Sequence, residues 1–102
     1  MTPVRGRVYW ADLGYGRKPW LVVSNNRRNA RFDDCLVVRI TTTAKPPDEP
    51  TVVRLTDEDQ LAGWVVCDDV TSAYCDELTD AGALTRATME RVNDGLRAAL
   101  AL

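Results

Sequence analysis

Two short segments of the chain carry side chains suited to binding a phosphate group. Arg17 and Lys18 stand side by side in a glycine-containing loop, residues 12–20, whose backbone can turn tightly and approach a ligand closely. Three consecutive threonines, beginning with Thr41 and Thr42, end a run of strand-forming residues. Cations and hydroxyl donors stabilise the negative charge that gathers on phosphate oxygens in a transition state. Each segment alone also fits an ordinary exposed loop or strand end.

Several familiar catalytic schemes are excluded. The chain has no histidine, so a Ser-His-Asp triad, a Cys-His pair and imidazole metal sites cannot form. Adjacent carboxylates at 33–34 and 68–69 should diverge in extended chain, and we expect no metal site and no cofactor. The chain has three cysteines, Cys35, Cys67 and Cys75, and no two of them form a C-x-x-C pair. An odd number without such a pair favours buried or half-buried free thiols.

Aromatic and amide side chains near the cations are candidates for binding the bases of a nucleic acid. Tyr15 and Trp20 could stack on bases, and Asn25 and Asn26 could bond to base edges. Arg27 could hold the phosphate backbone. The same residues also fit plainer roles, because tryptophan is a common core residue and asparagine-rich stretches are typical of turns.

Charge is distributed unevenly along the chain. Residues 1–31 contain seven basic residues and one acidic residue, whereas residues 32–102 contain six basic and fourteen acidic residues. The first third could therefore form a basic patch for a polyanion. The alternative is a surface on which the charges intermix after folding, and composition leaves both open.

Length and composition indicate one globular domain over residues 1–102. The chain is 45% hydrophobic and 27% charged, and no apolar run approaches the ~20 residues that span a bilayer. The N-terminus lacks the apolar core of a signal peptide. We expect a cytoplasmic protein without membrane contact.

Short strand-like runs must position the candidate residues. They are expected at 4–13, 20–24, 35–43, 51–55 and 64–67, with 70–74 extending or following the last. Pro19 is expected at the start of the second run, and residues 56–59 should form a single helical turn. Because neighbouring strand residues point to opposite sides, only one of Arg17 and Lys18 should face a given groove.

The C-terminal segment changes to helical periodicity. Apolar residues recur at spacings of three and four over 86–100, which predicts an amphipathic helix with Thr85 as its N-cap. Gly95 within it suggests close packing on that face or simple tolerance. Five or six short strands followed by one helix favour a mainly β fold, a small SH3-like or OB-like barrel.

The order of these motifs resembles the MazF/PemK family of ribonuclease toxins. Residues 5–13 (RGRVYWADL) are similar to the family's opening RGD-(I/V)-(Y/W)-x-x-D-L, and residues 18–25 (KPWLVVSN) to RP-x-(L/V)-V-(V/I)-S-N. Residues 38–42 (VRITT) resemble a strand end, V-x-(I/x)-T-(T/S), and 69–70 fit a later D-x-(I/V) position. The resemblance covers nearly the whole chain.

This resemblance implies a small MazF/CcdB-like barrel that forms a homodimer, cuts single-stranded RNA without metal, and is neutralised by a cognate antitoxin. The family's catalytic threonine corresponds to Thr41. Its catalytic arginine precedes the proline of the second motif, where this chain has Lys18, with Arg17 one residue earlier. Both cations are therefore candidates, together with Thr41. RNA-binding candidates are Tyr15, Trp20, Asn25, Asn26, Arg27 and Thr42.

Without histidine or metal, the attacking group would be the 2′-OH of the RNA, giving a 2′,3′-cyclic phosphate and a 5′-OH, an outcome that the family resemblance supports. We expect Lys18 to act as acid or base and Arg17 to hold the phosphate, with the reverse assignment open. Two other function classes remain, since a fold does not define an activity. They are a non-catalytic barrel toxin that traps DNA gyrase and an RNA-binding barrel without catalysis.

Overall fold

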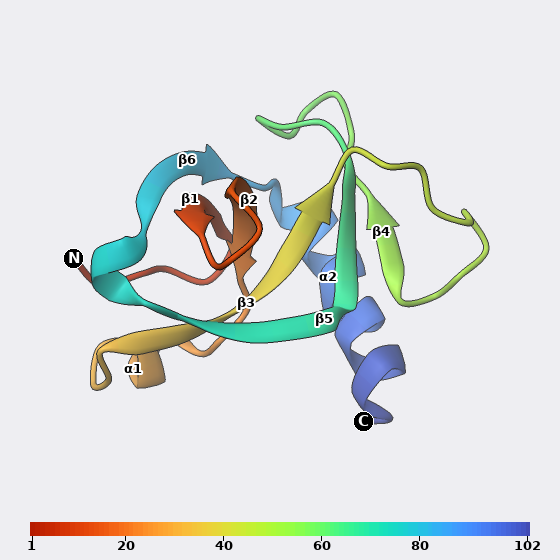
Figure 1. Ribbon diagram of the computed structural model, residues 1–102. Coiled ribbons are helices and arrows are strands. Elements are labelled where there is room, and N and C mark those ends of the chain that lie inside the picture. Colours follow the sequence, from red (N-terminus) through yellow and green to blue (C-terminus); the bar gives the residue numbers. More distant parts are fainter.

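A computed structural model describes residues 1–102 and consists of a curled sheet with one long helix (Figure 1). The six strands are β1 (Arg7–Asp12), β2 (Arg17–Val22), β3 (Asp34–Thr41), β4 (Val52–Arg54), β5 (Trp64–Tyr74) and β6 (Thr79–Ala83). The helices are α1 (Asn26–Asn29) and α2 (Arg86–Leu100), and a 3₁₀ turn spans Cys75–Glu77.

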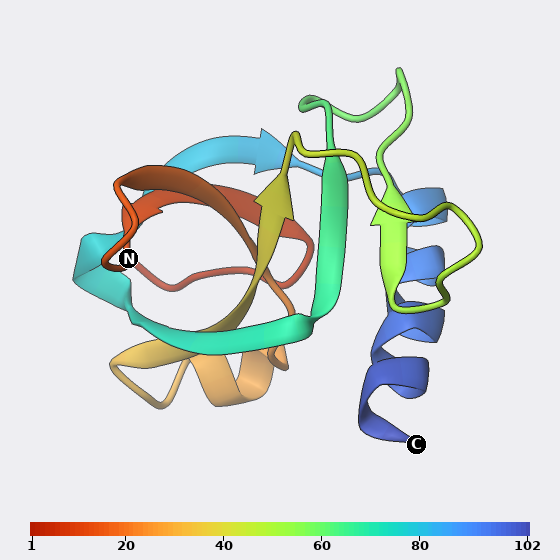
Figure 2. The same cartoon turned by 45° about the vertical axis from the view of Figure 1, so that its right-hand side comes forward.

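All strands pair antiparallel in one sheet with the order β4-β5-β3-β2-β1-β6. Figure 2 shows how β1, β2, β3, β5 and β6 curl around one another, with β4 and α2 side by side at the other end of the sheet. The sheet is not closed, because β4 and β6 remain its two edges. The expected class, mainly β with a C-terminal helix and a barrel-like curl, is confirmed.

Neighbouring residues of each central strand are buried in two different cores. Val8, Leu21 and Val38 belong to a cluster with Val92 of α2, on the helix side of the sheet. The preceding or following residues, such as Tyr9, Trp20 and Val37, belong to a second cluster inside the curl. Alternation along a pleated strand therefore fills both faces, which explains why the strands are so continuously apolar.

The helix α2 lies against β4 and β5. Thr85 caps its N-terminus, where the Thr85 Oγ1 accepts a hydrogen bond from the backbone N–H of Thr88, as the sequence predicts. A Cβ atom at Gly95 would lie only 2.7 Å from the Sγ of Cys67 in β5. Close packing is therefore the reason for this glycine.

The structure corrects several predicted elements. Pro19 is the third residue of β2, not its first, because the strand begins at Arg17. Residues 56–59 form an isolated turn, closed by the N–H of Asp59 donating to the Thr56 carbonyl, and no helix continues from it. The asparagine-rich stretch begins the short helix α1, which Asn25 caps through its side chain. Residues 70–74 continue β5.

A register shift bends the longest strand. Val38 pairs with Val70, but the next residue of β3, Arg39, pairs with Val66. The intervening residues of β5, 67–69, form a bulge that bends the strand and reorients side chains. Asp69 lies in this bulge, where it is close to Arg39 of β3.

Candidate functional site

The candidate site is a cavity of about 680 Å³ at the end of the sheet where β2 begins and β3 ends. Its walls come from the β1–β2 hairpin, the end of β3, the β4–β5 connection and the bulge of β5. The lining residues are Trp10, Tyr15, Arg17, Lys18, Pro19, Trp20, Arg39, Ile40, Thr41, Thr42, Thr43, Leu61, Ala62 and Asp69. All three candidate catalytic residues thus line one cavity.

The cavity opens where two neighbouring strands separate. β2 and β3 pair only as far as Trp20 and Arg39, although β2 continues beside β1 to Arg17 and β3 continues beside β5 to Thr41. Pro19 has no N–H with which to continue a ladder. Extending the register by two residues would set Lys18 opposite Thr41. The space between the separated strand ends is therefore bordered by a cation and a hydroxyl.

Thr41 is held firmly at the tip of β3. Its backbone pairs with Trp64, and the backbone of Gly63 packs so closely that a Cβ there would clash with the Thr41 carbonyl. The Thr41 Oγ1 accepts a hydrogen bond from the N–H of Thr43 at 3.1 Å. Accepting this bond leaves the hydroxyl proton of Thr41 available to donate to a phosphate oxygen.

Both cations line the cavity, so the expectation that only one would face it is wrong. The guanidinium of Arg17 lies over the ring of Trp10, 5.1 Å from its centroid, and Lys18 is exposed. The two side chains still point to opposite faces of β2, because the strand stays paired with β1 as far as Arg17. The cavity surrounds the end of β2 that lies beyond its pairing with β3. Residues on both faces of the strand therefore line it.

Sequence reasoning missed Arg39 and Asp69, which also line the cavity. The Nε of Arg39 lies 2.9 Å from Oδ2 of Asp69, but the N–H is not aligned with that oxygen, so the contact is an ion pair without a hydrogen bond. One signal was present, because Arg39 is two residues before Thr41 and shares its side of the strand. The β5 bulge that brings Asp69 close had no sequence signal.

The aromatic candidates divide into exposed and buried residues. Tyr15 is 73% exposed at the cavity, so its ring is accessible for stacking. Trp20 is 2% exposed and belongs to the inner core, which leaves its ring without a free face, contrary to the stacking expectation. Its Nε1 is buried without a hydrogen-bond partner. Trp10, which the sequence analysis did not select, is partly exposed at the cavity.

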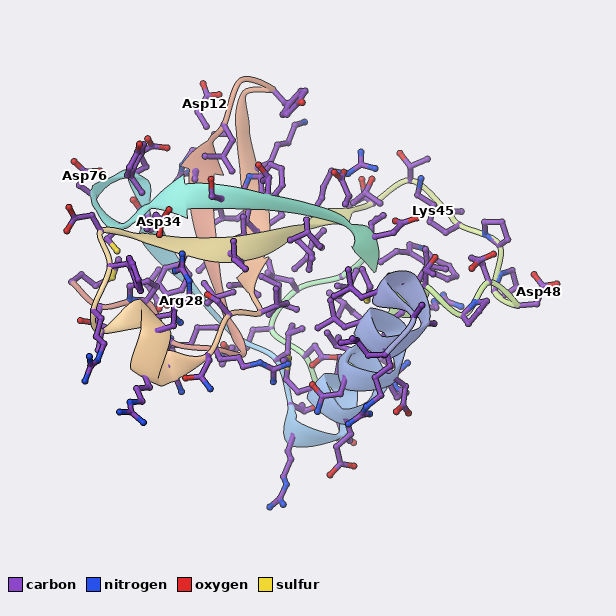
Figure 3. All side chains as sticks on the ribbon, turned by 90° about the horizontal axis from the view of Figure 1, so that it is seen from below. Asp12, Arg28, Asp34, Lys45, Asp48 and Asp76 are labelled. Carbon is purple, nitrogen blue, oxygen red and sulfur yellow. The ribbon has the colours of Figure 1, made fainter.

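Asn25, Asn26 and Arg27 do not line the cavity. The side chain of Asn25 caps α1, and the Asn26 Oδ1 accepts a hydrogen bond from the N–H of Arg5. Figure 3 shows α1, marked by Arg28, well apart from the β1–β2 hairpin end marked by Asp12. The structure therefore gives both asparagines local roles in folding. Thr42, in contrast, lines the cavity as expected.

The basic residues of the first third do not form one continuous patch. Arg5 donates to the Val23 carbonyl and to Asn93, so it joins α2 to the sheet. Ion pairs join Arg7 to Asp80 and Arg28 to Asp34. Hydrogen bonding from Arg7 holds the pKa of Asp80 below its ordinary value. Much of this charge therefore serves the fold, and the free cations at the cavity are few.

The metal-ligating residue types do not gather at any point, and no group of three or more carboxylates and thiols has the arrangement for a cation. Burial raises the pKa of both Cys35 and Cys67 to about 11, while Cys75 is partly exposed. All three thiols are free, as expected.

Comparisons with known proteins identify relatives of the whole chain. A family model described as PemK-like, MazF-like toxin of type II toxin-antitoxin system matches residues 4–100. Endoribonuclease MazF1 of Mycobacterium bovis and endoribonuclease MazF4 of Mycobacterium tuberculosis are each 48% identical over 102 residues, covering 99% of this chain and 95% of theirs. No helix of the structure has the length and hydropathy required to cross a bilayer.

Solved structures give the same result. A mycobacterial endoribonuclease in complex with its cognate antitoxin is 46% identical, with a TM-score of 0.93 over 98% of this chain and 96% of that one. A MazE-MazF complex from Deinococcus radiodurans, 22% identical, has a TM-score of 0.85 over 100% of this chain and 98% of that one, which shows the shared fold.

Proposed function

Because this chain belongs to the PemK-like, MazF-like toxin family of type II toxin–antitoxin systems, we propose that it is a toxin that cleaves RNA and is neutralised by a cognate antitoxin. Its substrate is single-stranded RNA, cut at short sequences. Relatives with this activity in their names match almost the full chain. Cleavage of cellular RNA would stop translation and growth.

One observation carries the site assignment: Thr41 of β3 lines the same cavity as Arg17 and Lys18 of β2. In the proposed reaction the 2′-oxygen attacks the adjacent phosphorus and forms a new P–O bond, while the bond to the 5′-oxygen breaks. The products are a 2′,3′-cyclic phosphate and a 5′-OH. The hydroxyl of Thr41 and one cation stabilise the phosphate oxygens, where negative charge accumulates.

Two protons must move in this reaction, one from the 2′-OH and one to the departing 5′-oxygen. Lys18 is the proposed acid–base group and Arg17 the phosphate clamp, with the reverse as the alternative. The position of Arg17 over the ring of Trp10 supports this division, because a guanidinium stacked on an aromatic ring is held in one orientation. Lys18 is exposed at the cavity and lies over no aromatic ring.

The exposed Tyr15 ring and the Thr42 hydroxyl complete the proposed RNA-binding surface. Arg27 stays a candidate only for RNA that extends beyond the cavity. The protein is proposed to act in the cytoplasm as a single domain and as a homodimer, with the antitoxin as its partner and without a cofactor.

The test is incubation of purified protein with end-labelled single-stranded RNA in excess EDTA. Discrete fragments ending in a 2′,3′-cyclic phosphate, identified by mass spectrometry, are expected. Binding without cleavage would instead support a non-catalytic RNA-binding barrel. If RNA is neither bound nor cut, a gyrase supercoiling assay would test the remaining alternative, a toxin that traps DNA gyrase.

A further inference from the structure

The side chain of Arg39 lines the cavity and is accessible to a ligand there. Its side chain is 39% exposed and that of its partner Asp69 is 49% exposed, so neither is sealed in the protein. The side chain of Arg39 makes no hydrogen bond within the chain, because even its Nε contact to Asp69 lacks the required alignment. The two terminal nitrogens of the guanidinium therefore keep their donors for a ligand.

Arg39 also stands beside the proposed catalytic group. Arg39 and Thr41 are two residues apart on β3, on the same side of the strand and about 6.7 Å from each other along it. A nucleotide next to the scissile phosphate would thus pass Arg39. The position is fixed on both sides, since Arg39 pairs across the sheet with Trp20 of β2 and with Val66 of β5.

The charge of this pair distinguishes it from the other cations. Asp69 largely neutralises Arg39, whereas no ion pair involves Arg17 or Lys18. A neutralised arginine adds little to the attraction of phosphates, which depends on net charge. Its planar fork still supplies two directed donors, which is what the reading of a base edge requires.

We propose that the Arg39–Asp69 pair reads the identity of one base of the RNA substrate, next to the cut. This inference rests on the proposed function. The base should present two adjacent acceptors to the fork, as guanine does with O6 and N7 and cytosine does with O2 and N3. Adenine and uracil alternate donors with acceptors and fit less well. Asp69 acts by holding the guanidinium in one orientation.

The experiment compares cleavage of a pool of RNA with randomised sequence by the wild type and three variants, Arg39→Met, Arg39→Lys and Asp69→Asn. Wild-type fragments are expected to show guanine or cytosine at one position. In Arg39→Met that preference should fall by about 5- to 150-fold, the discrimination of one good bidentate contact. Arg39→Lys should lose it too, because an ammonium lacks the fork. Asp69→Asn should weaken it.

A second measurement separates base reading from phosphate binding. Affinity for an uncleavable RNA, with a 2′-deoxy sugar at the cut, is measured over a range of salt concentrations. Arg39→Met should keep the wild-type salt dependence, whereas loss of a phosphate contact lowers the slope of log affinity against log salt by about 0.7. The matched control is Arg97→Met, which removes the arginine of another exposed Arg–Asp ion pair, on α2 outside the cavity.

Specific results would overturn the inference. They are an unchanged preference in Arg39→Met and Asp69→Asn, full rescue by Arg39→Lys, a reduced salt slope, or loss of preference at a position occupied by adenine or uracil. Failure of the wild type itself to cut RNA would count against the proposed function instead. Circular dichroism of each variant shows that it is folded, and Asp69→Asn tests the pair while Arg39 stays in place.

Discussion

Lys18 and Thr41 line one cavity although β2 and β3 stop pairing two residues before either of them. The two strands separate beyond Trp20 and Arg39, each staying with its other neighbour. Had the ladder continued, the two side chains would lie across a closed sheet with no room for a substrate. The loss of pairing is therefore what makes the site, and Pro19, which cannot donate to a ladder, sits at the point of separation.

The first prediction concerns the hydroxyl of Thr41. Thr41→Val keeps the shape of the side chain but removes the donor, so cleavage should slow by about 10²–10³-fold. Single-turnover cleavage of a labelled RNA measures this. Thr71→Val, at an exposed position of β5 outside the cavity, is the control. If Thr41→Val cleaves at the wild-type rate, the hydroxyl of Thr41 does not take part in cleavage.

A second prediction separates the two cations. Lys18→Met should lower the single-turnover rate and change its pH profile, because the variant lacks the proposed acid–base group. Arg17→Met should lower the rate about 10²–10³-fold but leave the shape of the profile unchanged. Both variants are assayed with saturating enzyme from acid to alkaline pH. If the pH profile changes in Arg17→Met and not in Lys18→Met, the two roles are reversed. Full activity of both variants would refute the proposed site.

The sequence allowed the prediction that Arg17, Lys18 and Thr41 lie at one cavity, because each stands at the end of a strand-like run with a distinctive pattern. The helix over 86–100 with its Thr85 cap was equally predictable from periodicity. Arg39 and Asp69 were not predictable as a pair, because their contact depends on the bulge in β5. Local sequence also could not show that Trp20 would be buried.

The third prediction concerns the packing of α2 on the sheet. Alanine normally stabilises a helix relative to glycine by about 1 kcal/mol. At Gly95 the new Cβ would lie 2.7 Å from the buried Sγ of Cys67, and overpacking costs about 1–3 kcal/mol. Gly95→Ala should therefore lower the free energy of unfolding in urea.

The same packing predicts rescue. In a Cys67→Ala background the obstructing sulfur is absent, so Gly95→Ala should be less harmful there than in the wild type. A double-mutant cycle should give a coupling energy of about 1 kcal/mol or more. Simple additivity would mean that the helix shifts to accommodate the Cβ, and that Gly95 is not required by Cys67.

The fourth prediction concerns thiol reactivity. The Cys35 and Cys67 thiols are buried, and burial raises the pKa of each to about 11. Since the thiolate is the reactive form, only the partly exposed Cys75 should react quickly with an aromatic disulfide reagent in the native protein. One thiol per chain is expected before denaturation and three after it. Cys75→Ser should abolish the fast phase, and its persistence would show that a buried thiol is accessible.

The last prediction concerns Asp59, which joins the turn after β4 to the start of α2. Its carboxylate accepts hydrogen bonds from the N–H groups of Thr56 and Thr85 and from the hydroxyls of Thr56 and Thr88. Burial alone would raise the pKa of Asp59, but these hydrogen bonds outweigh burial and lower it. Asp59→Asn puts an amide N–H toward groups that are already donors, so it should cost about 2–3 kcal/mol near neutral pH.

The pH dependence of this cost follows from the lowered pKa of Asp59. The unfolded chain binds the proton more readily than the native protein, so the contribution of the carboxylate is complete above its ordinary value of 3.8 and is lost as pH falls below it. The difference in unfolding free energy between the wild type and Asp59→Asn should therefore stay constant down to about pH 5 and shrink as the pH falls further. Asp57→Asn, an exposed position in the same turn, is the control. A difference that stays constant at lower pH as well would mean that Asp59 stabilises the turn through its shape and not through its charge.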